Sequence, residues 1–106
     1  MSAPELEIAW DPAKASSNRA KHGVSFADAA TVLLDPLALT VFDAAHSEEE
    51  DRWFTLGQTR QGSLLAVAHT YQVTGPDHAR VRIISARPAT RREREHYEHA
   101  SRQATP

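Results

Sequence analysis

The stretch ARVRIISARPATRREREHYEHA, residues 79–100, changes its hydrophobic period half-way and so contains two kinds of element. Its first part alternates arginine with valine or isoleucine, which is the two-residue period of a strand with one buried face. After Pro88, Thr90 suits a helix N-cap and Glu93 stands where a capping box needs it. The stretch therefore predicts a strand over 79–87 that leads into a helix over 91–100.

The sequence before this unit predicts four more strands and two more helices. Asp11 and Pro12 are typical of a helix start, and Gly23 of the residue after a helix end. Ser25 can cap a second helix, which Asp35 and Pro36 would end. The expected strands cover 7–10, 37–42, 52–59 and 63–71.

These elements give the order β-α-α-β-β-β-β-α. We expect an α+β fold in which three helices pack on a small antiparallel sheet, because the later strands are joined mostly by short turns. The length of 106 residues fits a single domain over 1–106, with a frayed tail at 101–106.

Composition excludes several classes of protein. The chain has no cysteine, so it has neither disulfides nor thiolate metal sites. No apolar run is long enough for a membrane span, and the N-terminus has no secretory signal pattern. We expect a protein of the cytoplasm with no membrane partner.

Charge is unevenly distributed along a chain of net charge −2. Residues 43–51 hold five acids and no base, whereas residues 80–94 hold six arginines and one acid. Lys14, Arg19 and Lys21 form a second basic group. Such a chain can present a basic face to a polyanion, or its arginines and acids can simply pair across a solvated surface.

Alternation along the arginine-rich strand separates two faces. Val81 and Ile83 belong to the expected core face, together with Ser85 and Arg87. The opposite face holds Arg80, Arg82, Ile84 and Ala86. Arg80 and Arg82 are then about 6 to 7 Å apart, which is close to the spacing of successive phosphates in nucleic acid. The alternative is that both arginines pair with acids on a neighbouring strand.

The start of the final helix is a second candidate anion site. Arg91 and Arg92 lie in its first turn, where the free backbone N–H groups already favour an anion, and Arg87 is close by. The alternative is a solvated helix stabilised by pairs such as Arg91 with Glu95.

Two histidines are candidates for proton transfer, since imidazole titrates near neutral pH. His69 lies in the most apolar strand, where a structural role is common, and His22 ends the first helix. His96 and His99 have a spacing that suits a metal, but no third ligand is evident, so we expect no metal site. We also expect no cofactor, because no glycine-rich phosphate loop is present.

Two long motifs, WDPAKASSNRAKHGVSFADAATVLLDP and RIISARPATRREREHYE, resemble the BrnT family of type II toxin–antitoxin toxins. The resemblance implies a RelE-like fold and an endoribonuclease that cleaves RNA and inhibits translation. It also implies a BrnA-like antitoxin with a ribbon-helix-helix part, which forms a hetero-oligomer with the toxin. In that complex the antitoxin contacts DNA, and the toxin does so only indirectly.

By position, the basic residues of the family fall on Lys21, His22, Arg52, Arg80, Arg82 and Arg87 of this chain. For metal-independent cleavage by a ribose 2′-OH, we expect Arg80, Arg82 and Arg87 to clamp the scissile phosphate. Lys21 would hold a neighbouring phosphate.

The general base of this reaction could be either His69 or His22. Arg91 is a further residue expected to bind an RNA phosphate. The competing hypothesis is a binding module without catalysis, whose arginines dock onto acids of an antitoxin. Two departures from the family pattern are Pro88 and a longer hairpin over 70–80, which would weaken or reshape the basic surface.

Overall fold

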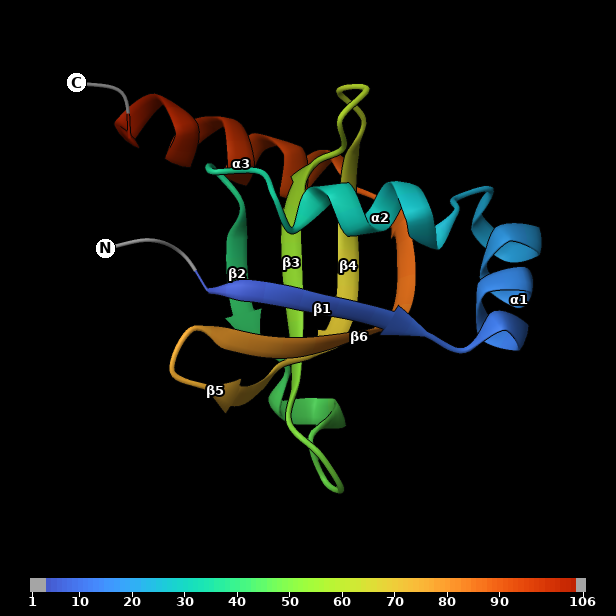
Figure 1. Cartoon of the computed structure of the whole chain (residues 1–106). Helices are drawn as coiled ribbons and strands as arrows, with labels where there is room; N and C mark the ends of the chain where they lie inside the picture. The colour runs from blue at the N-terminus through green and yellow to red at the C-terminus, as the bar shows by residue number, and fades with distance from the viewer. Residues whose placement is uncertain (1–3, 105–106) are drawn as a thin grey trace.

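A computed structural model describes residues 4–104 of the chain, and its cartoon is shown in Figure 1. The α+β class is confirmed. The helices are α1 Pro12–His22, α2 Phe26–Val32 and α3 Arg91–Ala104, with a short 3-10 helix η1 Ala44–His46. The strands are β1 Glu5–Trp10, β2 Leu39–Phe42, β3 Arg52–Gln58, β4 Leu64–Thr70, β5 Gln72–Gly75 and β6 His78–Pro88.

The sheet has the strand order β1-β6-β4-β3-β2, and β5 pairs with β6 beside this path. Two features depart from the expected sheet. It is mostly antiparallel as expected, but β1 pairs with β6 in parallel, from Glu5 opposite His78 to Trp10 opposite Ile83. A strand that was not expected follows Tyr71, since Gln72 pairs with Arg80 and Val73 with Ala79.

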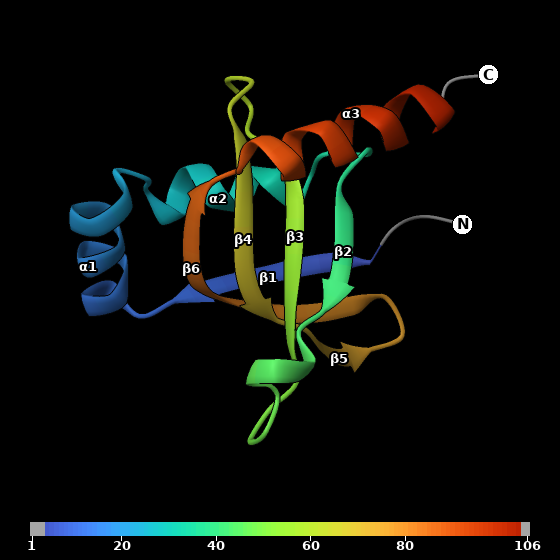
Figure 2. The same cartoon turned by 180° about the vertical axis from the view of Figure 1, so that it is seen from behind.

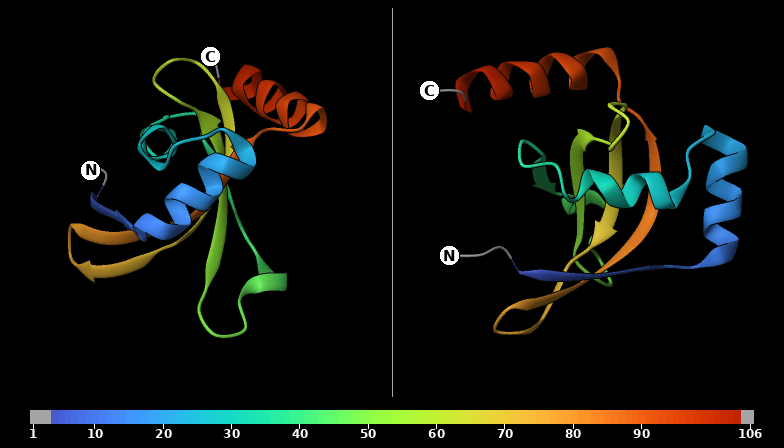
Figure 3. Two further views of the ribbon diagram at one scale, coloured as in Figure 1. Left: turned by 90° about the vertical axis from the view of Figure 1, so that its right-hand side faces the viewer. Right: turned by 45° about the horizontal axis from the view of Figure 1, so that its top comes forward.

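Two layers cover the sheet from opposite sides. Figure 3 shows α2 on one face, with α3 and the η1 segment on the other. Phe26, Ala29 and Val32 of α2 are fully buried against Val67 and Ile83 of the sheet, in the hydrophobic core. The remaining core residues are Val24, Leu65 and Ala86. Figure 2 shows the second face, which α3 crosses only near one end of the strands.

The helix boundaries follow their capping residues. Asp11 Oδ1 accepts a hydrogen bond from Ala13 N at 2.8 Å, and Gly23 takes the left-handed conformation at φ 70°. The predicted capping box forms, because Glu93 N donates to Thr90 Oγ1 at 3.1 Å and Thr90 N donates to Glu93 Oε1 at 2.8 Å. Helix α3 continues to Ala104, so 101–104 are helical rather than frayed, and 105–106 lie outside the described residues.

A bulge in the pairing of β4 with β6 changes the expected faces of β6. Ala68 lies opposite Ser85 but His69 opposite Ile83, so Ile84 is the extra residue. Val81 and Ile83 are buried as predicted, and Arg80 and Arg82 are exposed. After the bulge the alternation inverts: Ala86 joins the buried face, and Ser85 and Arg87 leave it. The assignment of Ala86 to the face of Arg82 was wrong for this reason.

Candidate functional site

One buried amide fixes α1 beside β6. Strand β1 stops pairing at Ile83, which leaves the edge of β6 open beyond that point. Asn18 of α1 forms hydrogen bonds with this free edge. Its Nδ2 donates to Ala86 O at 2.9 Å and its Oδ1 accepts from Ala86 N at 3.0 Å. The amide imitates a strand partner, because it donates and accepts at one residue, and it holds α1 in place against the sheet.

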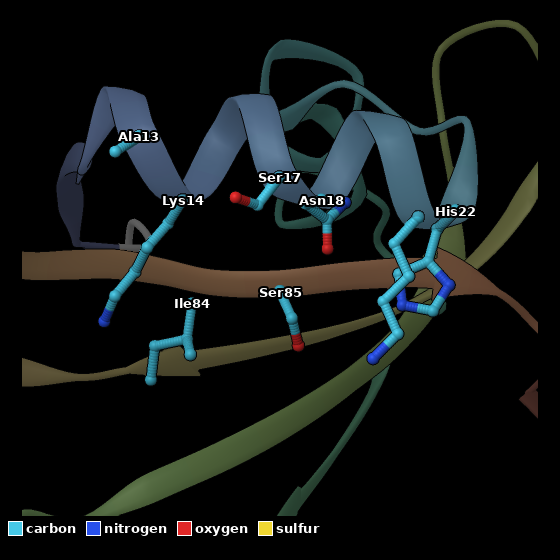
Figure 4. A pocket seen from close by; sticks show the side chains of 8 residues that line it. Ala13, Lys14, Ser17, Asn18, His22, Ile84 and Ser85 are labelled. Atoms are coloured by element: carbon cyan, nitrogen blue, oxygen red, sulfur yellow. The ribbon is translucent and has the colours of Figure 1, made fainter.

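A cavity of about 330 Å³ lies between α1 and β6. Figure 4 shows α1 above the strand that contributes Ile84 and Ser85, with the Lys14 side chain reaching down across that strand. The full lining is Ala13, Lys14, Ser17, Asn18, Lys21, His22, Ile84 and Ser85. Both lysines of the chain are therefore in one cleft, and none of its eight described lining residues is acidic.

This cleft has the chemistry of an anion site. Lys14, Ser17 and Lys21 recur on α1 at steps of three to four residues, so they share one face of the helix. Lysine supplies a mobile charge with three donors, and serine hydroxyls can donate to phosphate oxygens. His22, half-buried in the cleft, adds an imidazole whose ring nitrogens can donate or accept a hydrogen bond. The cleft can thus bind a phosphate through several donors, with an imidazole beside it.

The two arginines of the first half of β6 are exposed and paired with acids. Arg80 Nε lies 3.5 Å from Glu7 Oε2 on β1, and Arg82 donates to Glu50 in the segment before β3. The expected alternative, pairing with acids on a neighbouring strand, holds for Arg80 but not for Arg82, whose partner Glu50 lies outside the strands. Such exposed pairs are weak, about 0.2 to 1 kcal/mol, so a phosphate can replace either acid.

Arg87 is held more firmly. Its two terminal nitrogens donate to the two carboxylate oxygens of Glu93, at 2.7 and 3.0 Å. This bidentate pair, helped by the Thr90 N–H bond, lowers the pKa of Glu93 to about 2 against the opposing effect of burial. Arg87 joins the end of β6 to the first turn of α3, so much of its hydrogen-bonding capacity is already used.

Arg52 and Arg91 lie outside the cleft. Arg52 borders a separate cavity of about 270 Å³ whose lining includes Glu48, Glu49 and Glu50. Its Nε is buried without a hydrogen-bond partner among the described residues. Arg91 is almost fully exposed, 3.4 Å from Glu95. The structure therefore does not bring all of the expected basic residues together.

His69 is enclosed in the sheet. Its side chain is 3% exposed, with Nε2 2.7 Å from Thr55 Oγ1 and Nδ1 2.9 Å from Thr70 O. Burial lowers the pKa of the imidazole, against the opposing effect of the Thr70 carbonyl. A buried, neutral ring with both nitrogens occupied serves packing, whereas His22 reaches the cleft.

Sequence reasoning missed three members of the site: Asn18, Ser17 and Ser85. Little in the sequence pointed to Asn18, because its neighbours one helical turn away include both lysines of the chain and His22 rather than an apolar stripe. Ser85 gave no signal, since only the bulge at Ile84 turns it toward the cleft.

Residues 4–104 offer neither a metal cluster nor a membrane-spanning helix. No group of three histidine, aspartate or glutamate side chains in this part of the chain is arranged to hold a metal ion. No helix in it is long and apolar enough to cross a membrane.

Comparison with known proteins identifies the family. No curated protein sequence matches the chain. The crystal structure of the Brucella abortus ribonuclease toxin BrnT, at 1.1 Å resolution, matches with a TM-score of 0.56 and 27% identity, covering 82% of this chain and 100% of that one. The family model for BrnT, the ribonuclease toxin of a type II toxin–antitoxin system, matches residues 10–93, which include both α1 and β6. The chain therefore belongs to the BrnT family of type II toxin–antitoxin ribonuclease toxins.

Proposed function

We propose that this ribonuclease cuts RNA in the cleft between α1 and β6, through attack of a ribose 2′-OH on the adjacent phosphate and without a metal ion. The observation that supports this location is the gathering of Lys14, Lys21 and His22 in one cavity with no acidic residue in its described lining. Positive charge there attracts a phosphate and repels a divalent cation, which prefers carboxylate ligands.

The reaction assigns a task to each group. His22 takes the proton of the 2′-OH, a bond forms from that oxygen to phosphorus, and the bond from phosphorus to the 5′-oxygen breaks. The departing oxygen accepts a proton from the Lys21 ammonium. The products are a 2′,3′-cyclic phosphate and a 5′-hydroxyl. Arg82, two residues before Ile84 on β6, stabilises charge on the phosphorane once RNA replaces Glu50.

The other basic residues bind the RNA backbone around the cleft. Arg80 lies two residues before Arg82 on β6, on the same exposed face. Its single ion pair with Glu7 is weak, so a phosphate can replace Glu7. Arg52 and Arg91 extend the path of the backbone at lower affinity. Arg87 contributes mainly through the position of α3, because Glu93 occupies both ends of its guanidinium. His69 has no role with substrate, since its ring is enclosed.

The partner that neutralises this toxin is a BrnA-like antitoxin with a ribbon-helix-helix part. Membership of a type II toxin–antitoxin family supports an antitoxin partner. The two proteins form a hetero-oligomer in the cytoplasm, and the complex contacts DNA through the antitoxin alone. The free toxin inhibits translation by cutting RNA.

The test is cleavage of a 5′-labelled RNA by purified, antitoxin-free toxin in EDTA, with analysis of the cut ends. We expect cyclic phosphate ends, and a loss of about 100-fold or more in rate for His22→Ala and for Lys21→Ala. Arg102→Ala is the matched control for lost charge, because it lies near the end of α3 far from α1 (Figure 1).

Three results would contradict the proposal. They are a requirement for added metal, 3′-hydroxyl ends, and full activity of folded His22→Ala. Circular dichroism and thermal unfolding of each variant separate loss of chemistry from loss of fold.

A further inference from the structure

We propose that the antitoxin anchors on the opposite end of the sheet from the cleft, by adding an extended, apolar and acidic segment to the free edge of β2. This proposal rests on the toxin–antitoxin assignment, but it does not depend on where RNA is cut. Its evidence comes from the edge of β2, the groove beside it and the charge along the rim of that groove.

Strand β2 is an unprotected edge. It pairs with β3 on one side, and no strand of the described chain pairs with its other side. Its sequence LTVF has no charge and no proline, the devices that usually blunt an exposed edge. Val41 is 60% exposed and Phe42 46% exposed. Figure 2 shows β2 as the outermost strand on this side, with the end of α3 passing over it.

An apolar groove of about 290 Å³ runs from this edge toward α3. Its floor is formed by alternate residues of β2, β3 and β4, which share one face of the sheet because Leu39 lies opposite Leu56 and Val41 opposite Phe54. The lining is Leu39, Val41, Phe54, Leu56, Ala66, Arg92, Glu93 and His96. A strand added to β2 would continue this floor and could direct alternate side chains into the groove.

The rim of the groove selects an acidic occupant. Arg92 and His96 line it from one face of α3, four residues apart. The only acidic residue in the described lining, Glu93, is already bound by Arg87 and by Thr90 N. The charge left for a partner is positive, so carboxylates of the incoming segment have partners there, while its apolar residues cover Val41 and Phe54.

The anchor is separate from the catalytic cleft. Strands β4 and β3 lie between β6 and β2, which places the free edge about 14 Å across the sheet from β6. A segment on β2 would therefore bind without entering the cleft. Neutralisation then requires a further part of the antitoxin to reach the arginines of β6.

The experiment uses the toxin and its cognate antitoxin, with affinity measured by titration calorimetry. Val41→Glu puts a carboxylate where the apolar side chains of the segment would lie, and we expect about 30-fold weaker binding or more. Arg92→Glu should weaken binding about 10-fold. Val73→Glu is the matched control, since Val73 is 70% exposed on a different strand, β5, and should bind within about twofold of wild type.

Hydrogen exchange in the complex tests the main-chain pairing. We expect slower exchange for amides of β2, and the same rate of RNA cleavage for Val41→Glu and Val73→Glu without antitoxin. Unchanged affinity of Val41→Glu, or exchange unaltered in β2, would overturn the proposal. So would a free toxin dimer that Val41→Glu dissociates, because a second copy would then occupy the edge. Failure of the cleavage mechanism would appear instead as inactivity in EDTA, whatever the binding result.

Discussion

The two halves of β6 use arginine in opposite ways. Arg82 in the first half is 44% exposed and has one ion pair, to Glu50 in the acidic segment before β3. Arg87 in the second half is 36% exposed and has two hydrogen bonds to Glu93, whose carboxylate also receives Thr90 N. The two arginines have similar exposure. They differ in the number of hydrogen bonds that must break before the guanidinium can bind another anion.

This difference separates a residue that can exchange partners from one that holds the fold. The single pair of Arg82 costs little to break, so a phosphate can take the place of Glu50. Breaking the fork between Arg87 and Glu93 also loosens the capping box of α3. The arginines nearest the start of β6 can therefore exchange their acids for another anion, whereas Arg87 joins β6 to α3.

Among the changes that test this comparison of arginines, the largest expected effect is on catalysis at Arg82. Arg82→Ala should lower the rate of RNA cleavage about 10- to 100-fold, because one charge-assisted contact to the transition state is lost. Its unfolding free energy should stay within about 0.5 kcal/mol of wild type, since the lost ion pair is exposed. Single-turnover cleavage and urea unfolding measure the two quantities. Equal activity of wild type and Arg82→Ala would remove the distinction between the two arginines.

The next effect is on stability at Arg87. Arg87→Ala should lower the free energy of unfolding by about 1 to 2 kcal/mol, after discounting for solvent screening of a partly exposed pair. Thermal unfolding should shift down by several degrees as a result. Arg94→Ala, on the exposed side of α3, is the control and should change stability by less than about 0.5 kcal/mol.

Low pH should abolish the stabilisation that the Arg87–Glu93 pair provides. The pKa of Glu93 is about 2 in the folded protein against 4.5 ordinarily, because Arg87 stabilises its charged form. A lowered folded-state pKa stabilises the protein fully above about 4.5, and this contribution is lost as the pH falls toward 2. The stability difference between wild type and Arg87→Ala should thus be constant from pH 7 to 5 and shrink below 4.5. A constant difference down to pH 2 in urea titrations would contradict this origin.

Much of the fold could be predicted because local signals agreed with the final structure. Asp11, Gly23, Ser25 and Thr90 act at helix ends through neighbours within a few residues, so the sequence carries the whole interaction. The parallel pairing of β1 with β6 could not be predicted in this way, because it joins residues more than 70 positions apart.

The site was harder to predict because a single bulge rearranges it. Strict alternation put Ala86 with Arg82 and Arg87 with Val81, and the extra residue at Ile84 reverses both assignments. Lys21 and His22 were identified from their charge at a helix end. Their meeting with Ser85 depends on Asn18, whose two bonds to Ala86 span 68 positions.

The smallest expected effect is a gain of RNA binding when the competing acid is removed. Glu50→Gln leaves Arg82 without its anionic partner, so the dissociation constant for RNA should fall about two- to fivefold, as expected for one exposed pair. Glu48→Gln makes the same change in net charge within the same acidic segment but does not release Arg82. Filter binding with both variants at one fixed salt concentration distinguishes the cases. An equal gain for both would mean that the segment acts only through long-range repulsion of RNA, and that Arg82 is no freer to exchange its partner than Arg87.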